Sequence, residues 1–240
     1  ITEINLPDTV ETIGEGAFCS CSRLQKIKLP ENLKEIKAET FSNCDNLNEI
    51  KLPEKLVKIG KRAFAYTRLL SSVTVPDSVT ALEGYAFYNS GIQSIHLPEN
   101  ITAIGDYAFA ECGVLYDINF PDRLNSIGYS AFYNCTNLAS ISFPESLTSI
   151  DTDAFTNCTS LREVYIPGSN VTFEKRAIGY GESTHYGLVL IGKKGSATEA
   201  YATANNISFN SADDPLIHYP AKEATCSQEG NNEYWHCDIC

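Results

Sequence analysis

Methionine is absent from the 240 residues, and only one tryptophan is present. A complete translation product begins with methionine, and Ile1 falls inside a repeating pattern, so we expect a fragment of a longer protein. The chain also lacks any run of about 18 apolar residues, which excludes a membrane-spanning helix from this fragment. No signal peptide is visible, and we expect any export signal or anchor to lie outside the fragment.

Basic residues are scarce. The chain has 18 Lys and Arg against 30 Asp and Glu, a net charge of −12. This balance argues against nucleic acid as a partner, because phosphate backbones are bound by clustered Lys and Arg. The charge is uneven, since residues 1–68 hold 11 of the bases against 10 acids. The imbalance serves solubility, or else it gives this end a preference for an acidic partner.

Repetition dominates the chain. Prolines recur every 23 residues with a single step of 22, and phenylalanines keep the same step. Self-similarity at this period predicts a solenoid of stacked coils, which offers extended surfaces to partners. The short step lies beside Ser90-Gly91, where we expect a local distortion. The repeated phenylalanines are Phe18, Phe41, Phe64, Phe87, Phe109, Phe132 and Phe155.

Each unit contains two apolar segments. In one unit, Ile27 and Leu29 alternate with lysines, which predicts a half-buried strand that ends at Pro30. The second segment, here Leu33 with Ile36, is followed in several units by glycine at a tight corner. An Ala-Phe pair comes next and is predicted to form a short helical turn. The phenylalanine would fill each of about seven coils, and the coils would share one continuous core.

Nine cysteines occur, and five of them share one repeat position with Thr67 and Ser90. A position that accepts Cys, Thr or Ser selects a small side chain, so we predict a ladder of buried free thiols. Because strands stack about 4.8 Å apart, a disulfide between neighbouring coils is the alternative. The five cysteines are Cys21, Cys44, Cys112, Cys135 and Cys158.

The pattern Leu-Pro-x-x-Leu-x-x-Ile-Gly-x-x-Ala-Phe-x-x-Cys-x-x-Leu-x-x-Ile resembles the BspA-like leucine-rich repeat of bacterial cell-surface proteins. The likeness covers about residues 1–167. It implies an α/β or mostly-β solenoid, a right-handed leucine-rich repeat stack with one parallel sheet and a C-terminal cap. It also implies an extracellular or cell-surface location and a role in adhesion.

The period fails after Pro167. Residues 168–210 are predicted to form a degenerate repeat and a strand-helix-strand cap, which would close the core against water. We expect the strand at 188–191, the helix at about 196–204 with Ser196 as its N-cap, and the second strand at 207–209.

The outward side chains of the predicted strands would line one open, polar face. Interaction hot spots are usually Trp, Tyr or Arg, and Tyr165 is the one aromatic residue in this row. The row is therefore either a solvated sheet face or a binding surface for host or cell-surface proteins. The residues expected to bind in the second case are Lys26, Lys28, Lys51, His96, Asn119 and Tyr165.

Catalysis has little support in the sequence. Ser94, His96 and Asp117 would lie on adjacent strands, but an open face lacks the buried base and oxyanion donors that acyl transfer needs. The glycine pairs do not form a phosphate-binding loop. We therefore expect no enzyme activity and no cofactor in the solenoid.

Residues 211–240 are predicted to be a linker and the start of a truncated Cys/His-containing module. A Cys-x-x-Cys pair with a distant Cys and His can form a tetrahedral zinc site, and a disulfide or free thiols are the alternatives. The candidate zinc ligands are His218, Cys226, Cys237 and Cys240.

Two main functions compete. In the first, an extracellular surface protein binds host proteins or other cells through the solenoid. In the second, the solenoid is a rigid spacer that displays another domain. An enzyme is a third and weaker hypothesis, and the repeat pattern does not name a ligand.

Overall fold

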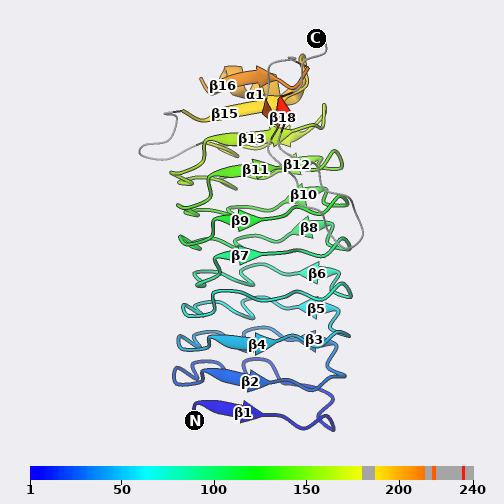
Figure 1. The fold of residues 1–240 in the computed structure, drawn as a ribbon, viewed down its shortest axis with the longest axis vertical. Coiled ribbons are helices and arrows are strands. Elements are labelled where there is room, and N and C mark those ends of the chain that lie inside the picture. Colours follow the sequence, from blue (N-terminus) through cyan, green and yellow to red (C-terminus); the bar gives the residue numbers. More distant parts are fainter. Residues whose placement is uncertain (180–186, 214–217, 220–233, 236–240) are drawn as a thin grey trace.

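The computed structural model describes residues 1–179, 187–213, 218–219 and 234–235. It is a parallel β-solenoid of about nine turns at a spacing of about 23 residues, which confirms the predicted fold class. The coils stack from β1 (Glu3–Asn5) at one end to α1 (Ala197–Ala204) at the other (Figure 1). The turn count exceeds the seven expected coils because the chain keeps winding after Pro167, where the sequence period fails.

One column of parallel strands follows the predicted alternation. Ile27 is buried between exposed Lys26 and Lys28, and Lys26 lies opposite Glu49 on the next strand. The column is interrupted at Ser72, which forms only an isolated bridge to Ser94, and again between β9 and β11. The strands after β1 are β2 (Lys26–Lys28), β4 (Glu49–Lys51), β7 (Ser94–Ile95), β9 (Asp117–Ile118), β11 (Ser140–Ser142), β13 (Glu163–Ile166), β15 (Val189–Gly192) and β16 (Ser208–Ser211).

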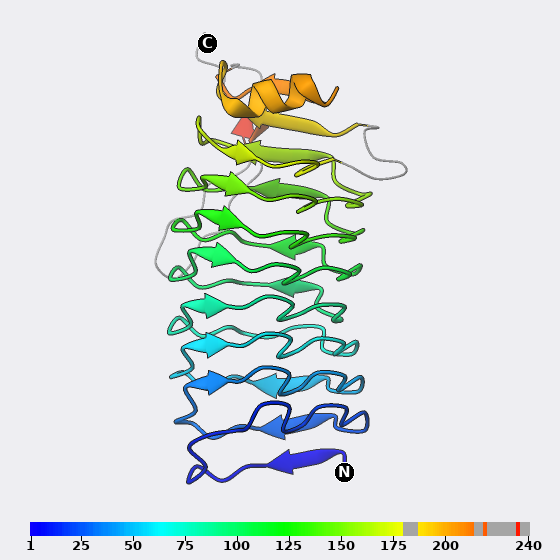
Figure 2. The ribbon, with the colours of Figure 1, turned by 180° about the vertical axis from the view of Figure 1, so that it is seen from behind.

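The second apolar segment of each unit forms a further column of short parallel strands. In β3, for example, Glu35 and Ile36 lie opposite Lys58 and Ile59 of β5. Figure 2 shows the stack from the side opposite to Figure 1. These strands are β3 (Glu35–Ile36), β5 (Lys58–Ile59), β6 (Ala81–Leu82), β8 (Ala103–Ile104), β10 (Ser126–Ile127), β12 (Ser149–Ile150) and β14 (Thr172–Phe173).

The Ala-Phe segment does not form the expected helical turn. It forms tight turns in which successive backbone N–H groups donate by turns to the next coil and to their own coil. The Phe41 N–H donates to the Ala63 carbonyl of the next coil at 2.9 Å. The Ser42 N–H donates to Glu39 within its own coil at 3.0 Å. Glu39 and Asn43 adopt left-handed backbone conformations, with φ of 56° and 59°. The third side of the solenoid is therefore also a ladder of hydrogen bonds.

The core is continuous along the stack. The seven repeated phenylalanine rings, from Phe18 to Phe155, stack in one column with centroids 4.9 to 5.5 Å apart and planes within 15° of each other. Beside them, Cys44, Cys112, Cys135 and Cys158 are buried, as predicted, and their thiols are free. Each thiol donates to a phenylalanine carbonyl of the preceding coil, at 3.0 to 3.2 Å.

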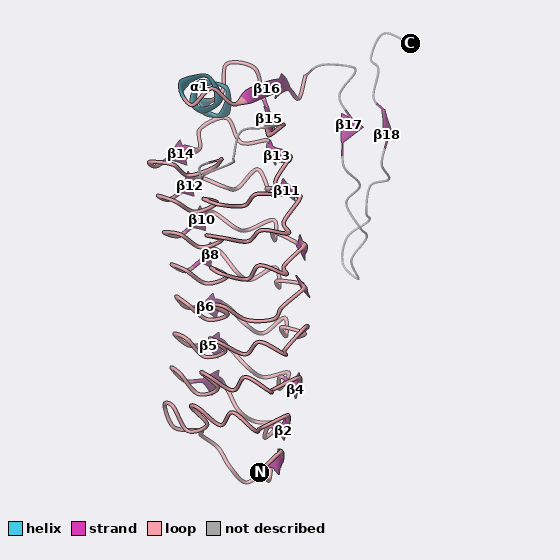
Figure 3. Ribbon diagram, turned by 90° about the vertical axis from the view of Figure 1, so that its left-hand side faces the viewer, coloured by secondary structure: helices cyan, strands magenta, loops and turns pink. Residues whose placement is uncertain are grey.

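The C-terminal turns keep the coil geometry with other side chains. Ile178 occupies the phenylalanine position and bridges to Phe155. Ser196 caps α1 as predicted, since its side chain accepts the Glu199 N–H. Tyr201 stacks on Phe173 with ring centroids 4.5 Å apart. The helix thus covers the end of the stack (Figure 3).

The remaining described strands are β17 (His218–Tyr219) and β18 (Tyr234–Trp235), which pair antiparallel. Within the described ranges, no helix is long and apolar enough to cross a membrane.

Candidate binding surfaces

The predicted strand-face lysines have different surroundings. Lys26 forms an ion pair with Glu49 at 2.7 Å, and the hydrogen bond to Glu49 raises the pKa of Lys26. Lys28 and Lys51 lie directly opposite each other, and neither forms an ion pair among the residues that the structure describes. Two like charges on adjacent strands repel, so this point is a small unpaired positive site.

Asn119 is hydrogen-bonded within the stack. Its side-chain amide donates to the Leu97 carbonyl at 3.0 Å and accepts the Leu97 N–H at 2.6 Å. These bonds lie just past the paired strands β7 and β9, where the two-residue ladder between their coils has ended. The amide therefore replaces part of the backbone ladder, and its polar atoms are occupied.

His96 and Tyr165 lie on the same face. His96 is exposed, and within the described chain no hydrogen bond joins it to Ser94 or Asp117. Tyr165 is half-buried and lies between Ser142 and Ile191 in the strand column. The imagined Ser-His-Asp grouping therefore has no hydrogen-bonded relay.

A second surface was missed in the sequence. On the turn side, tyrosine rings from four consecutive coils touch one another in an unbroken chain. Ring centroids lie 4.6 Å apart for Tyr85 and Tyr107, and 5.2 to 5.6 Å apart for the other pairs. We call this surface the tyrosine belt, which consists of Tyr66, Tyr85, Tyr88, Tyr107, Tyr129 and Tyr133.

Arginines cover one end of the tyrosine belt. The Arg62 guanidinium lies 4.9 Å from the Tyr85 ring centroid, and Arg68 lies 5.5 Å from that of Tyr66. Both arginines are also held by carboxylates of the preceding coil, Arg62 by Glu39 and Arg68 by Asp45. Such cation–π contacts add about 0.5 to 1 kcal/mol at exposed sites. The rings are therefore fixed before any partner arrives.

The other end of the belt borders a hollow of about 340 Å³. Tyr107, Tyr129 and Tyr133 line it together with an ion pair in which Arg176 contacts the buried carboxylate of Asp153 at 2.5 Å. Ser130 and Thr156 complete the lining. The hollow thus combines aromatic walls with a few fixed polar groups, which is the usual makeup of a recognition site.

Two of the belt hydroxyls have raised pKa values. Burial raises the pKa of Tyr107 to about 12, and its hydrogen bond with Tyr129 contributes. Burial also raises the pKa of Tyr88, with Tyr66 adding to the effect. These two hydroxyls are therefore neutral at physiological pH, and each already interacts with a neighbouring tyrosine of the belt.

The belt had a signal in the sequence. Tyr85 and Tyr107 both stand two residues before the repeated phenylalanine, and Tyr88 and Tyr133 both stand one residue after it. A period-aligned comparison of the variable positions would have shown this clustering. The outward positions of the strands do not include these tyrosines, so the predicted binding face does not contain the belt.

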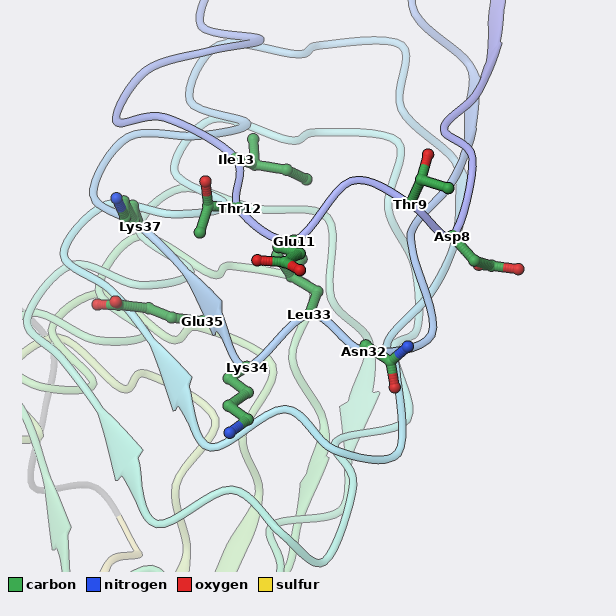
Figure 4. A pocket seen from close by; sticks show the side chains of 10 residues that line it. All are labelled: Asp8, Thr9, Glu11, Thr12, Ile13, Asn32, Leu33, Lys34, Glu35 and Lys37. Atoms are coloured by element: carbon green, nitrogen blue, oxygen red, sulfur yellow. The ribbon is translucent and has the colours of Figure 1, made fainter.

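A larger hollow, of about 540 Å³, separates the first two coils. It exists because residues 8–13 do not pair with β3, although their sequence matches later coils. Figure 4 shows Glu11 and Lys34 among the side chains around it. It is open and lined by charges of both signs, so it offers no specific chemistry.

The predicted zinc ligands are not tested. Cys226, Cys237 and Cys240 lie outside the described residues, and of His218 only the backbone pairing with Trp235 is described. Within the described part of the chain, no group of three or more His, Cys, Asp or Glu residues is arranged to hold a metal ion.

The repeat has known relatives. Six copies of the BspA type leucine rich repeat region match residues 1–112 and 81–185. The chain belongs to this family. No curated protein matches the chain.

Solved structures resemble this BspA-type chain. A leucine-rich repeat protein from Bacteroides ovatus is 31% identical over 80% of this chain, with a TM-score of 0.61. A leucine-rich repeat protein of T. pallidum is 30% identical over 57% of the chain, with a TM-score of 0.54. One from Eubacterium ventriosum shares the fold at 24% identity over 73% of the chain, with a TM-score of 0.54. The chain spans 55%, 64% and 57% of these proteins, respectively.

Proposed function

We propose that this chain is part of an extracellular surface protein that binds proteins of a host or of other cells through an exposed side of its solenoid. Membership of the BspA-type family supports a role in protein–protein interaction. The tyrosine belt carries the proposal, because clustered Tyr and Arg are the residues that dominate binding energy at protein interfaces.

The belt suits binding better than the strand face does. Its rings are half-buried and already packed, so little side-chain entropy is lost when a partner covers them. On the strand face, Lys26 and Asn119 are held by Glu49 and Leu97. Lys28 and Lys51 remain the stronger binding candidates there, with His96 beside them.

The test compares two surface variants in binding to extracellular-matrix proteins and whole cells. In the belt variant, Tyr85→Asn is combined with Tyr107→Asn, since Asn tolerates the left-handed backbone of both positions. In the strand-face variant, Lys28→Glu is combined with Lys51→Glu. The control is Tyr116→Asn, whose ring is 57% exposed and lies outside the belt. We expect the belt variant to lose most binding and the control to keep it.

A rigid spacer is the second proposal. Hydrogen bonds between coils on all three sides and one continuous phenylalanine column favour it, because they join neighbouring coils even where a strand column is interrupted. If both surface variants bind as the native chain does, the solenoid acts as a spacer and the adhesive proposal fails.

The family and the similar structures are repeat proteins that are not known enzymes, and we propose that this chain has no catalytic activity, no nucleic-acid partner and no cofactor in the solenoid. A zinc module after residue 211, with His218, Cys226, Cys237 and Cys240 as ligands, remains a separate proposal. Elemental analysis of a chain extended past Cys240 tests it, and a metal-free result would refute it.

A further inference from the structure

The length of the tyrosine belt and the separation of its rings indicate which kind of ligand would fit it. It crosses four coils, from that of Phe64 to that of Phe132, which is about 14 Å at the usual strand spacing of about 4.8 Å. Tyr88 and Tyr133 occupy the same position two coils apart, and Ala110 fills that position in the coil between them. These two rings therefore lie about 9.6 Å apart along the axis.

This spacing matches a polyproline II helix. Three residues of that helix rise about 9.3 Å. Side chains at i and i+3 therefore lie on one side, at nearly the separation of the Tyr88 and Tyr133 rings. Prolines pack on aromatic faces, and a preformed helix loses little entropy on docking. About five residues would cover the belt from end to end. Proline carbonyls are exposed acceptors, and a tyrosine hydroxyl can donate a hydrogen bond to them.

The charge around the belt adds a preference. Residues 60–160 contain ten Asp and Glu against four Lys and Arg. Of these arginines, Arg62 and Arg68 are already paired with carboxylates. Asp106, which is exposed beside the belt, accepts the Tyr129 N–H. A ligand with basic residues would therefore be attracted to this face.

We propose that the tyrosine belt is a docking surface for proline-rich protein segments that carry Lys or Arg beside the prolines. The proposal rests on the proposed binding function and names the partner chemistry of the same surface. The rings supply the apolar contact, the hydroxyls bond the carbonyls, and the surrounding carboxylates attract the basic flanks.

The test uses a fluorescein-labelled peptide of ten prolines with two arginines at each end, titrated with the full chain and followed by fluorescence anisotropy. A control peptide keeps the arginines and replaces the prolines by alternating glycine and serine. The protein variants are the belt variant and Tyr116→Asn, and circular dichroism melting confirms that each is folded. A glucose hexasaccharide is tested in parallel as a competitor.

We expect the proline peptide to bind at least about tenfold more tightly than the control peptide, and the belt variant to lose about tenfold in affinity. Tyr116→Asn should bind as the native chain does, and added salt should weaken the complex. Equal binding of both peptides, or unchanged binding by the belt variant, overturns the proposal. So does belt-dependent binding of the hexasaccharide without binding of the proline peptide.

The two proposals fail separately. If the belt variant loses cell or matrix binding while the proline peptide does not bind the native chain, the partner chemistry is wrong and the binding function stands. If the belt variant still binds cells and matrix proteins, the belt is not the adhesive surface.

Discussion

At the scale of single residues, left-handed backbone is a regular part of the design. In most coils, two residues flank the phenylalanine with positive φ, and they include Arg62, Tyr66 and Glu111, at 55°, 61° and 62°. Such a conformation costs a non-glycine residue about 1 to 2 kcal/mol. It directs the flanking N–H groups to carbonyls of the next coil, so a hydrogen bond offsets the cost. The sequence shows this only in part, because Asn stands at the second flanking position in four coils, whereas Tyr66 and Glu111 stand there in others.

The buried thiols should react slowly with alkylating reagents. Burial raises the pKa of Cys44 and Cys158 to about 12 and that of Cys112 to about 11, so the reactive thiolate is scarce at neutral pH. Cys19 and Cys21 are partly exposed. In iodoacetamide labelling mapped by mass spectrometry at pH 8, we expect Cys19 and Cys21 to react much faster than the buried set. Equal rates for Cys112 and Cys19 would contradict the burial.

The Asn119 amide should contribute to stability through both of its groups. In Asn119→Asp the carboxylate faces the Leu97 carbonyl and cannot donate to it. We expect a loss of about 1 to 2 kcal/mol in the free energy of unfolding. Asn137→Asp, at an exposed position, is the matched control and should change little. Urea denaturation measures the stability of both variants. Equal urea midpoints for Asn119→Asp and Asn137→Asp would show that the amide bonds do not contribute to stability.

At the scale of the element, the buried repeat positions were predictable from the sequence, but the pairing of the strands into columns was predictable only in part. Alternation at Ile27 predicted the first strand column, and the phenylalanine spacing predicted the core. The second apolar segment was identified, but its strands were not predicted, because they are only two residues long, as at Glu35–Ile36. The distortion expected beside Gly91 stays a prediction, whereas the interruptions of the first strand column at Ser72 and between β9 and β11 were not predicted.

Gly91 should be intolerant of any side chain. A Cβ there would lie 2.1 Å from the Arg68 carbonyl oxygen, a backbone atom that cannot move aside. We expect Gly91→Ala to cost about 3 kcal/mol or more in the free energy of unfolding. Gly14→Ala is the matched control, since a Cβ there meets nothing within 4 Å. The two are compared by thermal melting, and similar melting temperatures would refute the close approach.

At the scale of the whole molecule, the period predicted the stacked architecture, and the resemblance of the repeat pattern indicated the family. The tyrosine belt did not, because it is formed by variable positions that only the coil register brings together. A sequence period identifies what the coils share, whereas the binding function proposed here depends on what differs between them. The partners of such a surface must therefore be sought through the variable positions.

The thiol ladder should make the whole stack sensitive to alkali. The folded state raises these thiol pKa values from the usual 9.0 to about 11 or 12, so it favours the neutral form. Their contribution is complete below about pH 9 and is lost as the pH rises toward 12, because the unfolded chain ionises first. Replacing Cys44, Cys112, Cys135 and Cys158 by Ser should flatten the fall in urea midpoint between pH 9 and 11. An unchanged slope would mean that other groups cause it.

Ladders on all three sides also decide how the stack responds to tension. A terminal coil is hydrogen-bonded to one neighbour only. Force applied along the axis would therefore unfold the coils one at a time from the end. Each released turn of 23 residues would lengthen the chain by about 75 Å, given about 3.4 Å per extended residue less the coil spacing. A tether built this way would yield in steps and leave the remaining coils, with their surfaces, intact.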